Sequence, residues 1–448
     1  MRLRSVAVAT WIAAAVAASP AAGDWPMYGH DLANTRSGGS AGPSATQVVT
    51  LSKTWRFDTK KGDITGTPVL AAGTLVVGSN GGWVFALNSV TGKLRWSHRV
   101  DGPVNGSAAI VPDPRARGGG LVYVAAAKPG RPHLVALRLR TGKPAWDAVL
   151  TSQARSDTFG SPVVWRKTIY IGTSGYFGEF TDPGGHARGS VVALDARTGK
   201  RRWRTFTVPR HHDGGGVWST PAIDTRTGRL FVGTGNAYHA PAANTTDAVL
   251  ALDARTGKIV RGFQATPNDV WTLADPTGPD ADFGASPNLF RDAKGRALVG
   301  EGQKSGVYWA LDRRTLKPVW RTRVGPGGAS GGILGSTAYD GARIYGPNTA
   351  GNLVWALDRT GALKWVSKAV GPLNFGAATV SNGVVYVTDF NGVVTARDAA
   401  SGLPLAQLPI GSPSFGGVTV AGKAVFAAVG TSMSPNGGSV VAFGDTSP

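Results

Sequence analysis

One pattern of apolar and polar positions is repeated along the chain. Each copy has a short alternating apolar run, such as residues 75–78 or 230–233, followed by a second apolar run around a central alanine. A Thr-Gly turn and a charged segment with a tryptophan follow, as in residues 84–96 and 191–203. Short apolar runs bounded by glycine turns are typical of β-strands. The central alanine recurs as Ala86, Ala136, Ala193, Ala251, Ala310, Ala356, Ala396 and Ala442.

Each unit also begins with a segment of small residues, so the pattern predicts four strands per unit. Successive alanines are 40 to 59 residues apart, and four-stranded units of this length, repeated radially, are typical of a β-propeller. A solenoid is the alternative. The last unit ends without its tryptophan strand, whereas residues 51–57 supply such a strand at the other end of the chain. We therefore predict an all-β fold, a single eight-bladed propeller over residues 24–448 that is closed by an N-terminal strand.

Two recurrent side chains are interpreted as scaffold. The tryptophans of the outer strands should pack between neighbouring blades, and the aspartates that precede the turns should accept hydrogen bonds from them. The tryptophans are Trp55, Trp96, Trp146, Trp203, Trp320 and Trp365, and the aspartates are Asp195, Asp253, Asp312 and Asp358.

Residues 1–23 have the pattern of an export signal. Arg2 and Arg4 precede an apolar stretch, residues 6–18, and small residues follow it. This stretch has 13 residues, whereas a bilayer-spanning helix needs about 20, so a cleaved signal peptide is favoured over a membrane anchor. We expect a protein without a membrane span that is exported to the periplasm or the cell exterior.

Charge and composition narrow the function. The 448 residues include 47 Lys and Arg against 27 Asp and Glu, a net charge of +20, but the basic residues are scattered and no nucleic-acid module is present. A nucleic-acid partner is therefore not expected. The chain has no cysteine, which excludes disulfides, iron–sulfur clusters, thiol nucleophiles and covalently attached c-type haem. His211, His212 and Asp213 suggest a metal site but lack a third spaced ligand, so a surface loop is the favoured interpretation.

Three segments are similar to the quinoprotein dehydrogenases, and to the branch that includes polyvinyl-alcohol dehydrogenases: residues 24–31, 282–288 and 302–312. This family consists of eight-bladed propellers that hold pyrroloquinoline quinone and Ca²⁺ on the axis, and the resemblance covers nearly the whole mature chain. It implies an exported enzyme that oxidises a primary or secondary alcohol by hydride transfer to Ca²⁺-bound pyrroloquinoline quinone. Without a built-in haem, the reduced cofactor would need a separate electron acceptor.

The resemblance also implies roles for individual residues. Glu179 and Asn236 match the family's Ca²⁺ ligands, and their oxygen donors suit a hard cation. Trp218 matches the tryptophan on which the quinone stacks, and Lys304 the cation that contacts the quinone oxygens. Asp282 is the expected general base beside Ca²⁺ and a further metal ligand.

Some assignments stay open. Asp280 and Asp269 are less favoured candidates for the base, because an insertion displaces the carboxylate from the family's usual position. Residues 104–110 have neither the adjacent cysteines nor the arginine of many family members. Arg188, or else Arg155, could then neutralise the cofactor's carboxylates. The alternative function is a non-catalytic propeller of the same repeat type that acts as a binding or assembly scaffold.

Overall fold

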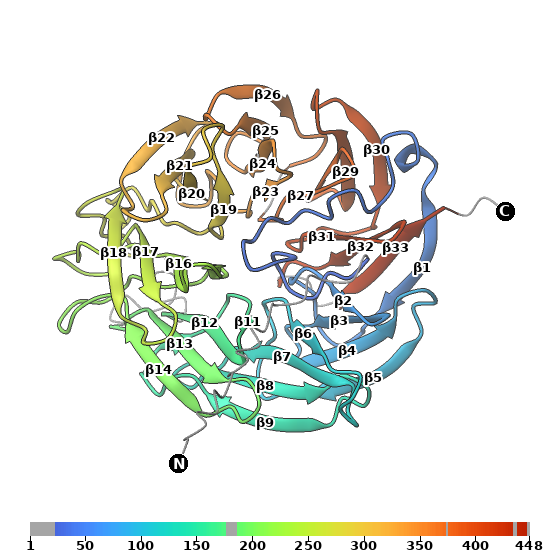
Figure 1. Cartoon of the computed structure of the whole chain (residues 1–448), viewed down its shortest axis with the longest axis horizontal. Helices are drawn as coiled ribbons and strands as arrows, with labels where there is room; N and C mark the ends of the chain where they lie inside the picture. The colour runs from blue at the N-terminus through green and yellow to red at the C-terminus, as the bar shows by residue number, and fades with distance from the viewer. Residues whose placement is uncertain (1–22, 176–185, 373–374, 433–436, 446–448) are drawn as a thin grey trace, which may run out of the picture.

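The computed structural model describes residues 23–175, 186–372, 375–432 and 437–445. Over these residues eight antiparallel sheets are arranged radially around one axis, which confirms the predicted eight-bladed propeller (Figure 1). The helical structure among the described residues is one 3-10 turn, η1 (Val48–Thr50), so no described helix could cross a bilayer.

In blades 1 to 7 the four main strands run outward from the axis in chain order. Blade 1 is β2 (Val69–Ala71), β3 (Thr74–Gly78), β4 (Trp83–Asn88) and β5 (Leu94–Arg99), and blade 2 is β6 (Ala109–Pro112), β7 (Gly120–Ala126), β8 (His133–Arg138) and β9 (Pro144–Val149). Blade 3 is β11 (Val163–Trp165), β12 (Thr168–Gly175), β13 (Ser190–Asp195) and β14 (Arg201–Phe206), with an extra short strand, β10 (Ser156–Asp157), paired to β12. Blade 4 is β15 (Ala222–Asp224), β16 (Arg229–Gly233), β17 (Ala248–Asp253) and β18 (Ile259–Gln264).

The remaining blades follow the same order. Blade 5 is β19 (Asn288–Arg291), β20 (Ala297–Gly302), β21 (Val307–Asp312) and β22 (Pro318–Arg323), and blade 6 is β23 (Ala338–Tyr339), β24 (Arg343–Asn348), β25 (Leu353–Asp358) and β26 (Leu363–Lys368). Blade 7 is β27 (Thr379–Ser381), β28 (Val384–Thr388), β29 (Val393–Asp398) and β30 (Pro404–Pro409). Blade 8 combines β31 (Val418–Ala421), β32 (Ala424–Val429) and β33 (Ser439–Gly444) with β1 (Ser52–Asp58).

The two ends of the described chain complete blade 8 together. Strand β1 lies antiparallel to β33 on the outer side of the blade, with Trp55 opposite Ala442 (Figure 1). This is the same pairing of tryptophan and central alanine that blade 1 shows between Trp96 and Ala86. The predicted closure by an N-terminal strand is therefore confirmed.

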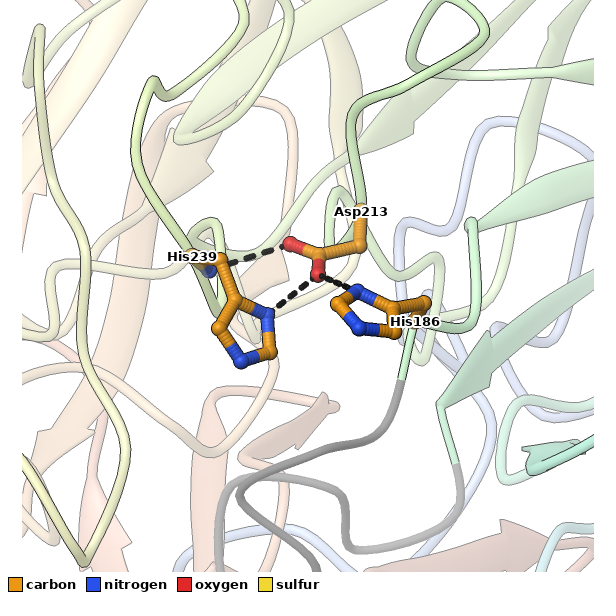
Figure 2. A group of neighbouring side chains, drawn as sticks. All are labelled: His186, Asp213 and His239. Atoms are coloured by element: carbon orange, nitrogen blue, oxygen red, sulfur yellow. Dashed lines mark hydrogen bonds and ion pairs between the residues drawn. The ribbon is translucent and has the colours of Figure 1, made fainter.

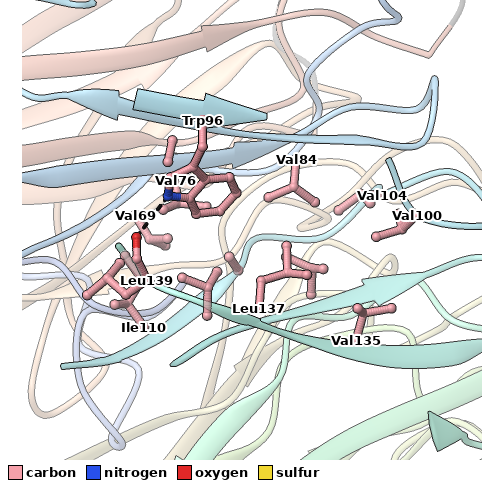
Figure 3. Packing of buried hydrophobic residues seen from close by; sticks show 14 of the residues in the cluster. Val69, Val76, Val84, Trp96, Val100, Val104, Ile110, Val135, Leu137 and Leu139 are labelled. Atoms are coloured by element: carbon pink, nitrogen blue, oxygen red, sulfur yellow. Dashed lines mark hydrogen bonds between the residues drawn. The ribbon is translucent and has the colours of Figure 1, made fainter. Parts of the chain in front are cut away.

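Each outer-strand tryptophan packs against the turn of the next blade, as predicted. In Figure 3, Trp96 of blade 1 lies over the apolar layer between blades 1 and 2, and its Nε1 donates a hydrogen bond to the backbone oxygen of Leu139, 2.8 Å away. The turn glycine of blade 2, Gly142, has φ +66°, and a Cβ there would lie 2.5 Å from the Trp96 ring. Glycine is required at this position both by the backbone conformation and by the close approach of the indole.

Small residues line the axis because the first strands converge there. Backbone N–H groups and side-chain hydroxyls of successive blades form a hydrogen-bonded series. Ser107 N donates to Ser161 Oγ (2.9 Å), and Ser161 N donates to Thr220 Oγ1 (3.2 Å). Thr220 N donates to Ser286 Oγ (3.0 Å), and Ser286 N donates to Ser336 Oγ (2.8 Å). The recurrent Ser-Pro and Thr-Pro segments thus tie neighbouring blades together.

The segment before β1 crosses the centre of the ring, where Figure 1 shows it in dark blue. Its backbone bonds to the first strands of several blades, for example through Ile223 N to Leu32 O and Leu289 N to Ala33 O. Arg36 is fully buried and donates hydrogen bonds to Ala378 O and to the Thr379 hydroxyl in blade 7. This segment therefore holds distant blades in place at one end of their inner strands.

Candidate functional site

The candidate site lies where the inner strands of blades 4 and 5 begin. Trp218 and Asp282 precede the first strands β15 and β19, while Asn236 and Lys304 follow the second strands β16 and β20. First and second strands are antiparallel in each blade, so these four positions share one end of the blades. The central segment before β1 instead bonds to residues inside the first strands.

A lysine and two aspartates form the centre of this site. The ammonium Nζ of Lys304 lies 2.6 Å from Asp280 Oδ1 and 3.0 Å from Asp282 Oδ2. All three side chains are buried, with exposed fractions of 4%, 1% and 2%. The structure thus brings together Asp282 and Lys304, which were singled out from the sequence, and adds Asp280 to them.

Asn236 is fixed beside Asp282. Its backbone N–H donates to Asp282 Oδ1 over 2.7 Å. Its side-chain Nδ2 donates to the backbone oxygens of Ala237 and Trp271, each 2.8 Å away. Both amide hydrogens are therefore committed to the backbone, which leaves Oδ1 as the acceptor side of the amide. An acceptor oxygen next to a carboxylate is the donor chemistry that calcium requires.

Trp218 lies against the same centre. A Cβ built on Gly284, two residues after Asp282, would lie only 2.0 Å from Cη2 of the Trp218 indole, so the indole occupies the space over that glycine. The Lys304 ammonium is 5.8 Å from the centre of the Trp218 ring. Trp218 is half-buried, so part of its flat surface stays accessible. A planar aromatic ligand could stack there beside the charged groups.

Two more aspartates extend the cluster. Asp247 precedes β17 and is fully buried, and neither of its carboxylate oxygens has a hydrogen-bond partner among the described residues. Asp269 is also buried and accepts hydrogen bonds from the backbone N–H groups of Asp280 and Ala281. Sequence reasoning missed Asp247 because it follows two threonines in a loop and resembles an ordinary turn residue.

Three of the buried aspartates at this centre have raised pKa values. Burial, together with the charge of Asp282, raises the pKa of Asp280 to about 7, although Lys304 opposes this shift. Burial and the carboxylates of Asp282 and Asp269 raise the pKa of Asp247 well above its ordinary value. Burial also raises the pKa of Asp269. Carboxyl groups crowded in a dry environment hold protons more tightly unless a cation is close to them.

For two of the predicted site residues the structure gives no contact with this centre among the described residues. Glu179 lies outside the described residues. The Arg188 guanidinium lies 3.7 Å from the ring centre of Phe206, and Arg188 lines a depression with His186, Arg210 and two further histidines. These neighbours are different from those of Asp282 and Lys304, and the role of Arg188 toward a cofactor stays a prediction.

The donor set fits a hard cation and a planar ligand. An orphaned buried carboxylate at Asp247, a carboxylate at Asp282 and an oriented amide oxygen at Asn236 are oxygen donors of the kind that bind Ca²⁺. Asp280 and Asp282 can accept a proton, Lys304 supplies a positive charge and Trp218 an aromatic surface. This arrangement is suited to proton removal beside a group that gains negative charge.

Comparison with known proteins identifies the family. The profile of the PQQ-repeat family described as outer membrane protein assembly factor BamB matches residues 47–271 and 246–446, most of the chain. The chain belongs to the PQQ-repeat, or quinoprotein, family of β-propellers. This confirms the family assignment made from the sequence segments around Asp282 and Lys304.

Among curated members of this family, two polyvinylalcohol dehydrogenases are similar to this chain. The one from a Pseudomonas species is 30% identical over 349 residues, covering 72% of this chain and 54% of its own. The one from Sphingopyxis sp. (strain 113P3) is 30% identical over 389 residues, covering 77% of this chain and 59% of its own. The chain thus spans just over half the length of these relatives.

A solved structure shares the fold of this chain. The quinohemoprotein alcohol dehydrogenase from Comamonas testosteroni superimposes with a TM-score of 0.79 at 22% identity. The match covers 95% of this chain and 81% of that one. At this identity the likeness establishes the propeller architecture.

Proposed function

We propose that this protein is an alcohol dehydrogenase that uses Ca²⁺-bound pyrroloquinoline quinone as cofactor and oxidises a primary or secondary alcohol, either a small molecule or a hydroxyl group of a polymer such as polyvinyl alcohol. The observation that carries the proposal is the buried centre of Lys304, Asp280 and Asp282, with Asn236 held against Asp282. The names of the polyvinylalcohol dehydrogenase relatives support the same reaction class.

The residues of the site are proposed to have different roles, according to their chemistry. Asn236, Asp247 and Asp282 supply oxygen donors for the cation, and Glu179 is proposed as a further ligand. Trp218 presents a flat surface to the quinone, while Arg188 is proposed to face its carboxylates. Pyrroloquinoline quinone and Ca²⁺ would supply a hydride acceptor and polarisation of the bound oxygens.

Asp282 is proposed to accept the hydroxyl proton of the alcohol. Its two oxygens are already fixed, by Asn236 N–H and by the Lys304 ammonium, so the carboxylate has a defined orientation. The Lys304 ammonium lies 3.0 Å from Asp282 Oδ2 and 5.8 Å from the centre of the Trp218 ring, so its charge would stabilise negative charge developing on a ligand stacked on that ring.

Asp280 is the second candidate for the base, and one observation favours it. Its Oδ2 is buried without a hydrogen-bond partner, and its pKa of about 7 is matched to proton transfer near neutral pH. If Asp280 is the base, Asp280→Asn should abolish turnover, whereas Asp282→Asn should retain measurable activity. If Asp282 is the base, Asp282→Asn should abolish turnover while Asp280→Asn keeps much of it.

The decisive experiment reconstitutes the purified protein with pyrroloquinoline quinone and Ca²⁺ and measures dye-coupled alcohol oxidation. Asp282→Asn and Glu179→Gln should each reduce the rate by at least about 100-fold, as expected for groups that act on the reacting atoms. The matched control is Asp312→Asn, a turn aspartate that accepts hydrogen bonds from Thr315 and Arg314 away from the centre. It should leave the rate unchanged.

Full activity in both site variants would reject these residue assignments. Failure of the wild-type protein to bind the quinone would favour the alternative function, a non-catalytic scaffold, for which the description of the matched family as an assembly factor provides the precedent. Binding of the quinone without turnover of small alcohols would direct the search to polymeric substrates.

Two further parts of the proposal concern the setting of the enzyme. Residues 1–23 are proposed to be a signal peptide, so the mature protein would act in the periplasm or outside the cell; N-terminal sequencing of exported protein tests this. The electrons are proposed to leave to a separate acceptor, because a chain without cysteine cannot attach a c-type haem covalently.

A further inference from the structure

Two histidines and an aspartate from three different loops meet beside blades 3 and 4 (Figure 2). His186 precedes β13, Asp213 lies between β14 and β15, and His239 lies between β16 and β17. Asp213 Oδ2 is 3.0 Å from His186 Nδ1 and 2.5 Å from His239 Nδ1. The two imidazole rings are 4.6 Å apart, and both direct Nδ1 toward the same carboxylate oxygen.

The carboxylate between the histidines is held in place by the backbone. Asp213 is buried, with 4% of its surface exposed. Its Oδ1 accepts hydrogen bonds from the backbone N–H groups of Tyr238 and His239, each 3.1 Å away. These bonds fix the carboxylate plane so that Oδ2 is presented to both imidazoles. Such outer hydrogen bonds orient a first ligand and increase metal affinity.

We propose that His186, Asp213 and His239 bind a first-row divalent cation of the zinc type. Two imidazole nitrogens and one carboxylate oxygen are a recurrent ligand set for such ions, with a fourth position left open. The three ligand atoms lie within 4.8 Å of one another. Tetrahedral coordination at about 2.0–2.1 Å needs ligand atoms about 3.3 Å apart, so small side-chain rotations would complete the site.

The surroundings define access and the fourth ligand. The side chain of His186 is 74% exposed, so an ion can reach the site from solvent. Arg188 and Arg210 line the depression that His186 also lines. We therefore expect water or a small anion at the open position, because these positive charges favour a negative ligand there.

This site shares none of the residues that are proposed to bind calcium, and it does not depend on the proposed function. The calcium centre offers oxygen donors only, whereas two of the three donors here are imidazole nitrogens, which suit softer transition metals. The sequence motif at residues 211–213 pointed to a metal, but the partners of Asp213 are 27 and 26 residues away in the chain. His212 instead contacts the backbone oxygen of Pro241 through Nδ1.

The test uses untagged full-length protein without quinone, in a buffer with millimolar Ca²⁺, and Co²⁺ as the probe. After desalting, bound cobalt is measured by mass spectrometry and its geometry by visible absorption. We expect one Co²⁺ per chain with the intense bands of a low-coordinate site, and displacement of the colour by Zn²⁺. Zn²⁺ should also raise the Tm of the wild-type protein, because it binds the folded state.

His186→Gln and His239→Gln should each lower Co²⁺ affinity by at least about 10-fold, and circular dichroism would check that both remain folded. The matched control, His98→Gln on strand β5, should bind like wild type. Asp282→Asn should also bind like wild type, which separates this site from the proposed calcium centre. Absence of bound cobalt in the wild-type protein, or its retention in His186→Gln and His239→Gln, would overturn the proposal, as would its loss in Asp282→Asn.

Discussion

A single methyl group at Gly284 should displace the Trp218 indole without changing any charged group. The Cβ of Gly284→Ala would lie 2.0 Å from Trp218 Cη2 and 2.3 Å from Cζ2. Carbon atoms in contact are normally 3.5–4.0 Å apart, so the indole must move by roughly 1.5 Å. Gly284 is absent from the positions with positive φ, so alanine introduces no backbone strain there.

The expected loss follows from that displacement. A shift of about 1 Å in a group that positions a substrate or cofactor can reduce the rate about 100-fold, which corresponds to about 2.7 kcal/mol. We therefore expect Gly284→Ala to lower kcat/KM by about 100-fold and to weaken quinone binding, while Asp282 and Lys304 stay in place. The assay is dye-coupled alcohol oxidation after reconstitution, with quinone affinity measured by tryptophan fluorescence.

The control is Gly262→Ala, on the exposed side of β18 in the same blade as Trp218. Its Cβ would approach only the flexible end of Leu250, at 3.1 Å, so activity should be unchanged. A double-mutant cycle of Gly284→Ala with Trp218→Phe tests the contact through the free energy of unfolding, which needs no cofactor. The smaller ring leaves room for the methyl group, so Gly284→Ala should cost less stability in that background than in the wild type. Wild-type quinone affinity and kcat/KM in Gly284→Ala would refute the argument that the indole forms the cofactor surface.

Three further predictions concern packing and charge. In denaturant titrations, Gly142→Ala should lower the free energy of unfolding by about 1–3 kcal/mol more than Gly383→Ala. Both glycines have positive φ, but only a Cβ at Gly142 would clash with an aromatic ring, that of Trp96. Equal losses of stability would contradict this prediction. In calcium-free buffer, stability should fall as pH rises from about 4 to about 7, because the folded chain keeps a proton on Asp280 that the unfolded chain releases. Asp280→Asn should reduce this loss of stability by a few kcal/mol, because each pKa unit corresponds to about 1.4 kcal/mol. An unchanged pH dependence would contradict the raised pKa of Asp280. Asp247→Asn should weaken Ca²⁺ binding, measured by calorimetry, at least about 10-fold. The metal-free variant should be as stable as the wild type or more stable at pH 7, because the substitution removes a buried carboxyl group without a hydrogen-bond partner among the described residues. Unaltered Ca²⁺ affinity would exclude Asp247 as a ligand.

The blades could be predicted from the sequence because their determinants are local and repeated. An alanine opposite a tryptophan recurs in six of the eight blades, and a turn glycine of the following blade lies against that tryptophan, as Ala86, Trp96 and Gly142 show. Ring closure could be predicted for the same reason, since the missing outer strand of the last unit has the same composition as the others. The central positions of Asp282 and Lys304 could be inferred through resemblance to a family.

Other features depend on contacts between distant parts of the chain. Arg36 bonds to Ala378 and Thr379, which lie more than 340 positions later in the chain. No local sequence pattern predicts that the segment before β1 connects several blades. Asp247 is buried near Asp269 and Asp282, which lie 22 and 35 residues later in the chain and raise its pKa. The His186–Asp213–His239 cluster escaped detection because its members belong to three loops whose spacing matches no metal motif.

The electrostatics of the proposed calcium centre argue for function over stability. If Asp247, Asp269, Asp280 and Asp282 were all ionised, the charge around Lys304 would be −4 + 1 = −3 in a buried place, although the whole chain carries +20. Removing an ion from water costs several kcal/mol, and one ammonium cannot offset four carboxylates. Without a cation the fold must therefore retain protons there, which is what the raised pKa values of Asp247, Asp269 and Asp280 express. A divalent cation would neutralise the carboxylates in place of those protons, which would leave a carboxylate able to accept a proton from a substrate. The crowded carboxyl groups that destabilise the metal-free protein are therefore the groups that the proposed enzyme would use.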